Sequence, residues 1–162
     1  MDWYVMLLVF LAVTAALDLF VGVSNDAVNF LNSALGCRIA SFRTVLWTAS
    51  AGVMLGATFS SGMMEVARSG VFHPQMFSFA EIMVIFLAVM VADILLLDTF
   101  NSLGLPTSTT VSIVFELLGS AVAAALFKLT SEGADWTAVA EFINSSKALA
   151  IVSGILISVA VA

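Results

Sequence analysis

The sequence has very few of the side chains on which metal centres, disulfides and nucleic-acid binding depend. It contains one cysteine, one histidine and five lysines or arginines. A single cysteine cannot form an internal disulfide, and one histidine with it cannot complete a zinc site. The net charge of −6 provides no basic face, so we expect no nucleic-acid partner.

The shortage of histidine also bears on catalysis. The one histidine, His73, stands beside Pro74 in a polar stretch, where a solvated loop side chain is the simplest interpretation. No serine therefore has an evident histidine base, and no set of metal ligands is present. The sequence predicts that the protein is not an enzyme and holds no resident cofactor.

What the chain has instead is apolar sequence. Hydrophobic residues make up 62% of its 162 positions and charged residues 10%, with a mean hydropathy of +1.15. A soluble domain usually has about 45–50% apolar and about 25% charged residues. The composition predicts an all-α integral membrane protein that crosses a plasma (inner) membrane several times.

Five apolar segments are predicted to be membrane helices, namely residues 3–23, 42–64, 79–100, 111–130 and 148–162. The first has no basic residue before it, so it is not a signal peptide. Residues 65–78 are predicted to form a loop, and residues 131–147 a loop with a short amphipathic helix. Arg38 and Arg43 favour a cytoplasmic loop after the first segment. No low-complexity linker divides the sequence, so we expect a single domain. The last segment is short for a span, so we expect this domain to be truncated at its C-terminus.

A polar run interrupts the apolar sequence between two of these segments. It reads Gly-Leu-Pro-Thr-Ser-Thr-Thr-Val-Ser over residues 104–112. Non-helical backbone at membrane depth is tolerated only where it is buried in protein or lines a wet cavity. Proline is accepted near a helix start, and Thr107 or Ser108 is a suitable N-cap. The free N–H groups of that helix, with the hydroxyls of Ser108, Thr109 and Thr110, predict an anion site.

A second polar interruption follows the first apolar segment, at residues 24–29. Paired discontinuous helices of this kind indicate a transporter site. Here we expect the C-terminal end of a helix, whose free carbonyls carry partial negative charge. Together with the oxygens of Asn25, Asp26 and Asn29 they would form an all-oxygen site for Na⁺, or Asp26 would carry a proton. An acidic residue inside a membrane is by default a functional hypothesis.

Other polar residues in the apolar segments leave alternatives open. Glu116 shares one helix face with Ser112 and Thr109, at spacings i,i+4 and i,i+7. It would tune the site, carry a proton or act only as a packing partner. Asp98 and Asn101 are expected to mark a solvated helix end.

These motifs resemble those of the PiT family of inorganic phosphate transporters. The family signature G-A-N-D-V-A-N resembles residues 22–29, with one residue inserted, and G-x-P-V-S-T-T-H resembles residues 104–111. A family L-G-A matches residues 55–57. The chain departs from the family at Val111, where histidine is usual, at Val53, where many members have glutamate, and at Glu116, where a small residue is usual.

The resemblance implies a fold of two inverted repeats, each carrying both motifs. This chain has each motif once, so residues 1–162 resemble the first, N-terminal repeat. The partner is then a missing C-terminal repeat, or a second copy in a homodimer. Alternating access would come from rocking between the repeats.

The function implied is cation-coupled symport of inorganic phosphate. Asp26, Ser108, Thr109 and Thr110 would bind phosphate, and Asn25, Asp26, Asn29 and Thr109 would bind the coupling cation, Na⁺ or H⁺. No metal is expected beyond a transported Na⁺. A sulfate permease of the same family is one alternative. Another is an ion channel with residues 107–110 as its filter, which requires a symmetric oligomer.

Overall fold

In the computed structural model, residues 2–60 and 70–161 are described, and these residues are almost entirely helical. The helices are α1 (Trp3–Gly36), α2 (Phe42–Phe59), α4 (Phe79–Leu103), α5 (Thr109–Glu132), α6 (Val139–Phe142) and α7 (Ser145–Val161). Two 3₁₀ turns, Pro74–Met76 and Trp136–Ala138, lie in the connections. An isolated antiparallel β-bridge joins Phe72 and Ile143. The predicted all-α architecture is confirmed for the described residues.

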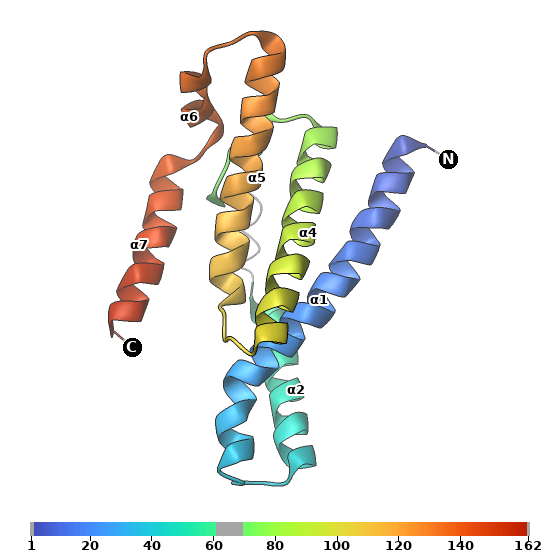
Figure 1. Cartoon of the computed structure of the whole chain (residues 1–162), viewed down its shortest axis with the longest axis vertical. Helices are drawn as coiled ribbons and strands as arrows, with labels where there is room; N and C mark the ends of the chain where they lie inside the picture. The colour runs from blue at the N-terminus through green and yellow to red at the C-terminus, as the bar shows by residue number, and fades with distance from the viewer. Residues whose placement is uncertain (1, 61–69, 162) are drawn as a thin grey trace.

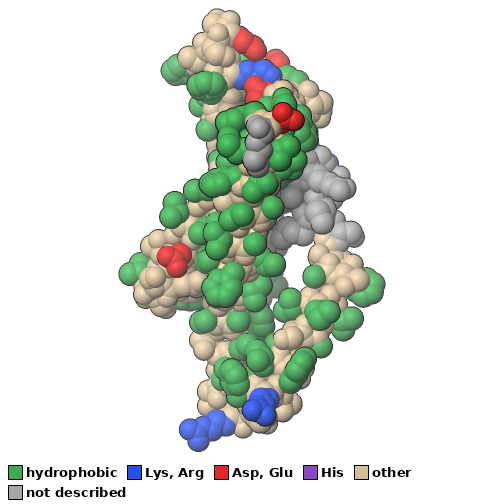
Figure 2. Space-filling view, turned by 90° about the vertical axis from the view of Figure 1, so that its right-hand side faces the viewer, with side chains coloured by type: hydrophobic (Ala, Val, Ile, Leu, Met, Phe, Trp, Pro, Cys, Tyr) green, Lys and Arg blue, Asp and Glu red, His purple; other side chains and the backbone are tan. Residues whose placement is uncertain are grey.

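Helices α1, α4 and α5 are long and apolar enough to cross a membrane. Helix α7 is also apolar but has only 17 residues. Large apolar side chains point outward, as Phe20 and Phe127 show with exposed fractions of 73% and 79%. Figure 2 shows hydrophobic side chains spread over the visible face, with Lys and Arg near the two ends of the long axis. Such a surface suits lipid around the middle of the molecule and water at its ends.

Helices α1 and α4 run side by side in the same direction, and α5 returns antiparallel to them (Figure 1). Thr14 on α1 lies against Met90 on α4, and Asn25 lies against Asn101, so both contacts have the same sequence offset. Between α4 and α5 the packed side chains include Ile85, Leu117 and Ala121, all at most 1% exposed. Aromatic residues of the adjoining connections and α6 extend this core.

The connection between α4 and α5 lies beside the middle of α1, not beside its end (Figure 1). Seven residues of α1 continue past Asn29, which bonds this connection, and they span roughly 10 Å at 1.5 Å per residue. Beyond this point α1 and α2 form their own apolar hairpin. The α4–α5 connection is therefore flanked by apolar helix on both sides, as expected for a re-entrant helix pair.

The predicted helix break at residues 24–29 is wrong. Helix α1 continues without interruption through this stretch to Gly36. The Ser24 hydroxyl donates to the Phe20 carbonyl at 2.7 Å, a bond to the preceding turn that a helix accommodates. Asn25, Asp26 and Asn29 bond to residues of other elements, so their side chains do not compete for the local backbone. No free helix end is present there, and the backbone carbonyls expected as cation ligands stay in the helix.

The other predicted segments agree with the structure to within a few residues. Helix α2 begins at the predicted residue and ends at Phe59, and the last predicted residues, 61–64, lie outside the described part. The predicted loop at 65–78 is described only from residue 70 onward. The stretch 131–147 contains the short helix α6, whose Phe142 is buried, as an amphipathic helix requires.

The start of α4 is fixed by a capping box, and this leads to a stability prediction. The Ser78 hydroxyl accepts from the Glu81 N–H at 3.3 Å, and the Glu81 carboxylate accepts from the Ser78 N–H at 2.6 Å. Lys128 on α5 approaches the same carboxylate at 3.4 Å. We expect Ser78→Ala to lower the free energy of unfolding by about 1 kcal/mol. Thermal unfolding of the two proteins in detergent measures this change in stability. Ser131→Ala, which removes an exposed hydroxyl near the C-terminus of α5, is the control. Equal losses of stability in both variants would contradict the capping role of Ser78.

Candidate functional site

The predicted interruption before α5 is present, and its backbone is shaped by glycine and proline. Gly104 adopts a left-handed conformation with φ 67° and ψ 26°. Its N–H donates to the Asn101 carbonyl, and the Leu105 N–H donates to the Phe100 carbonyl, which closes α4 in a Schellman motif. Pro106 cannot continue a helix because it lacks an N–H. The chain therefore turns within residues 104–108 and starts a new helix.

Helix α5 begins with Ser108 as its N-cap, as predicted. The Ser108 hydroxyl accepts from the Val111 N–H at 3.4 Å. The first N–H groups of α5 carry partial positive charge, and this end of α5 lies beside α1. There the Thr109 hydroxyl lies 3.2 Å and 3.4 Å from the two carboxylate oxygens of Asp26, to which it donates. An acidic side chain at a helix N-terminus is electrostatically favourable, so this contact aligns α1 and α5.

Asparagine amides join α1 to the other two parts of the site. Asn25, only 2% exposed, donates from Nδ2 to Oδ1 of Asn101 near the end of α4, at 2.9 Å. Asn29 donates to the Thr107 carbonyl at 2.9 Å and to Oδ1 of Asn25 at 3.3 Å. The irregular backbone before α5 is thus held by side chains from the middle of α1.

The structure therefore brings together four of the predicted site residues, Asn25, Asp26, Asn29 and Thr109. The Ser108 hydroxyl is close by but is used to cap α5. Thr110 is exposed. Asn101 is a site residue that the sequence interpretation placed at a solvated boundary. Its position just before the polar run was the available signal in the sequence.

Two hollows flank the connection between α4 and α5. One, of about 410 Å³, is lined by the amide groups of Asn25, Asn29, Asn32 and Asn101 and by residues 104–106. The other, of about 440 Å³, is lined by Thr107, Ser108, Ser112 and Glu116 with apolar neighbours. The first hollow thus exposes polar groups beside the connection, whereas the exposed lining of the second is mostly apolar.

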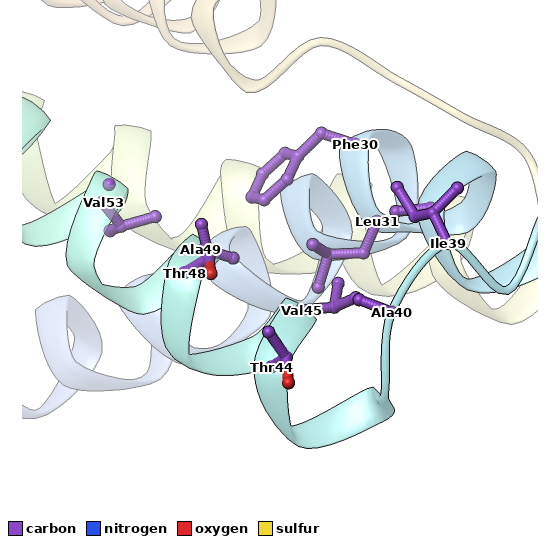
Figure 3. Close-up of a pocket in the computed structure, with 11 residues that line it drawn as sticks. Phe30, Leu31, Ile39, Ala40, Thr44, Val45, Thr48, Ala49 and Val53 are labelled. Atoms are coloured by element: carbon purple, nitrogen blue, oxygen red, sulfur yellow. The ribbon is translucent and has the colours of Figure 1, made fainter.

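A third hollow, larger than these two, has a different character. It lies between α1 and α2, has a volume of about 540 Å³ and is lined mostly by apolar side chains such as Leu31, Val45 and Val53. Figure 3 shows these side chains, with the Thr44 and Thr48 hydroxyls as the polar groups among those labelled. Such a lining offers no charge or donor array for an ion.

The polar residues of the site provide both donors and a negative charge. Hydroxyls and the helix N-terminus favour an anion, whereas the Asp26 carboxylate and the asparagine oxygens favour a cation. Among the described residues that form these contacts there is no lysine or arginine. The arrangement can therefore hold an anion and a small cation next to each other.

The comparisons with known proteins bear on what the solute is. The family model described as the phosphate transporter family matches residues 22–162. The matched region includes Asn25, Asp26, Asn29 and the whole polar run before α5, together with two of the three long apolar helices. A search of curated proteins and a search of solved structures gave no match. The chain is an integral, multi-pass membrane protein and belongs to the phosphate transporter family.

Proposed function

We propose that this protein couples phosphate transport to a cation, as a symporter. The observation that supports it most directly is the contact between Asp26 and Thr109 at the N-terminus of α5. The Asp26 carboxylate lies at the N-terminus of α5, where an anion would also bind. A site built for phosphate alone would not need that carboxylate, because it repels the substrate.

The size of that repulsion argues for a co-bound cation. Two unit charges about 4 Å apart interact by about 4 kcal/mol at an effective dielectric constant near 20. With Asp26 ionised, the binding of phosphate at the α5 N-terminus would be weakened by a repulsion of about this size. A Na⁺ ion beside Asp26, or a proton on it, removes the cost. Cation and phosphate then bind together more readily than either binds alone, which is the thermodynamic basis of coupling.

The roles of the residues follow from their positions. The α5 N–H groups, with Ser108, Thr109 and Thr110, would bind phosphate. The coupling cation would lie between the Asp26 carboxylate and the phosphate. Asn25, Asn29 and Thr109 would orient Asp26 and supply oxygen ligands, with Asn101 fixing the Asn25 amide. The second repeat, or a second copy of the chain, would close the site from the side on which Thr110 is exposed.

Radiolabelled phosphate uptake by the full-length protein in liposomes tests the proposal. We expect saturable uptake that is driven by an inward Na⁺ gradient or an inward proton gradient, and that is slow when both are absent. Excess unlabelled sulfate should compete poorly. Uptake that ignores both gradients would contradict coupling, strong competition by sulfate would point to a sulfate permease, and flux far above carrier rates would point to a channel.

A further inference from the structure

Three acidic side chains lie inside the helix bundle, about two helical turns from the start of α5, and one of them, Glu116, also lines the second hollow. They are Asp18 on α1, Asp93 on α4 and Glu116 on α5. Asp93 is close enough to act on both of the others, and Asp18 also acts on Glu116. It is only 3% exposed, and Asp18 and Glu116 are half-buried.

The second observation is that each of these carboxylates has one buried oxygen without a hydrogen-bond partner. Oδ1 of Asp93, Oδ1 of Asp18 and Oε2 of Glu116 are buried without a hydrogen bond in the described structure. Within the same residues, the only ion pair is formed by Lys128 with Glu81, near the other end of α5. The hydroxyl of Ser112, which donates to Glu116 at 2.9 Å, is a neutral neighbour. The charged groups that face each of these carboxylates from the packed helices are therefore the other two.

Three negative charges cannot stay together in such surroundings. Like charges in contact disfavour ionisation, and two carboxylates that share a site characteristically hold one proton between them. A protonated carboxyl can also donate to a neighbouring carboxylate, which satisfies the buried oxygens. A metal ion is the other way to neutralise the cluster, but the described residues contain no group of acidic, histidine or cysteine side chains arranged to hold one.

The spacing connects this cluster to the site at the α5 N-terminus. Asp18 precedes Asp26 by eight residues on α1, Asp93 precedes Asn101 by eight on α4, and Glu116 follows Thr109 by seven on α5. Each pair is about two helical turns apart, or roughly 12 Å. The same three helices thus carry two polar layers, so a shift of one helix against another changes the contacts in both layers.

We propose that Asp18, Asp93 and Glu116 form a proton-binding site, separate from the phosphate site, that is loaded and unloaded during the transport cycle. The inference rests on the proposed function for its role in transport, but the binding of a proton does not. The proton would be taken from water on one side, shared among the carboxylates, and returned to water on the other. Asp93 is the most buried of the three and faces both of the others.

Infrared spectroscopy of the full-length protein in liposomes tests proton binding without any transport. A protonated carboxyl has a C=O stretch distinct from that of a carboxylate. We expect this band to be lost as pH is raised from about 5 to about 9. Asp93→Asn and Glu116→Gln should remove or shift the titrating band. Asp98→Asn, which changes an exposed carboxylate on the same helix, should leave it in place.

The pH profile of phosphate uptake then tests the role in transport. One coupling proton changes the protonated fraction by up to about tenfold per pH unit. Phosphate itself changes its protonation over this range in every variant, so we expect uptake by the wild type to vary several-fold with pH and uptake by Asp93→Asn to vary less steeply, while Asp98→Asn follows the wild type. A purely structural role for Asp93 would lower uptake at every pH without flattening the profile.

The outcomes separate this inference from the proposed function. Gradient-driven phosphate uptake with no titrating carboxyl band would overturn the proton site and leave symport intact. A band that is unchanged in both Asp93→Asn and Glu116→Gln would also overturn it. A titrating band that is lost in these variants, in a protein without phosphate uptake, would support the proton site and overturn the proposed function.

Discussion

Phosphate uptake is expected to fall by at least about 100-fold when Asp26 is replaced by asparagine. A hydrogen bond to a charged group contributes about 1.5–3 kcal/mol, which already corresponds to about 10–150-fold in affinity. Asp26→Asn weakens the bond from Thr109 and also removes the negative charge at the α5 N-terminus that would attract the coupling cation. Cation and phosphate binding are linked, so the loss of one lowers the other.

The substitution keeps the size of the side chain, so the fold should survive. Asparagine still offers an oxygen to Thr109, and α1 does not depend on Asp26 for its own backbone bonds. Equal amounts of protein in the membrane, and unchanged thermal unfolding in detergent, are the conditions for interpreting the result. Asp98→Asn makes the same chemical change at an exposed position and should transport normally. Wild-type uptake by Asp26→Asn would contradict the role given to this carboxylate.

The sequence predicts the helices well because membrane helices follow from apolar length alone. Helix α4 starts at the predicted residue, where serine and glutamate form a capping box, and α5 starts after the predicted proline and N-cap. Each of these ends is set by residues within a few positions along the chain. Local chemistry was sufficient, and no knowledge of packing was needed.

The error at residues 24–29 has the opposite origin. Asn and Asp disfavour helix interiors when their side chains compete for nearby backbone groups. In α1 the partners are instead Asn101, Thr107 and Thr109, about 75–85 residues further along the chain. Local sequence does not reveal such partners, so a packed polar face was interpreted as a break.

The same reason explains which site residues were found. Asp26 and Thr109 belong to conspicuous polar runs, and the structure places them in contact. Asp93 is a single polar residue in an apolar stretch and Asn101 lies in a short polar stretch at the end of α4, and the importance of each depends on what lies opposite it. The interaction of Glu116 with Ser112 was predictable because both lie on one helix, whereas its interaction with Asp93 was not.

Phosphate affinity should also depend on the hydroxyls at the start of α5. We expect Thr109→Val and Thr110→Val each to weaken phosphate binding by about 1–3 kcal/mol, the cost of leaving a buried polar partner unsatisfied. Valine matches threonine in shape, so the change is mainly the loss of a donor. Competition of unlabelled with labelled phosphate, measured as uptake by the full-length protein, gives the two affinities.

The two variants should differ in their response to the cation. The Thr109 hydroxyl donates to Asp26, whereas Thr110 is exposed on the side where the second repeat or a second copy would close the site. Thr109→Val should therefore also change the concentration of cation needed for half-maximal uptake, and Thr110→Val should not. Thr109→Ser, which keeps the hydroxyl, should restore both properties. Unchanged phosphate affinity in both valine variants would show that these hydroxyls serve only the start of α5, and the anion would then have to bind through backbone N–H groups alone.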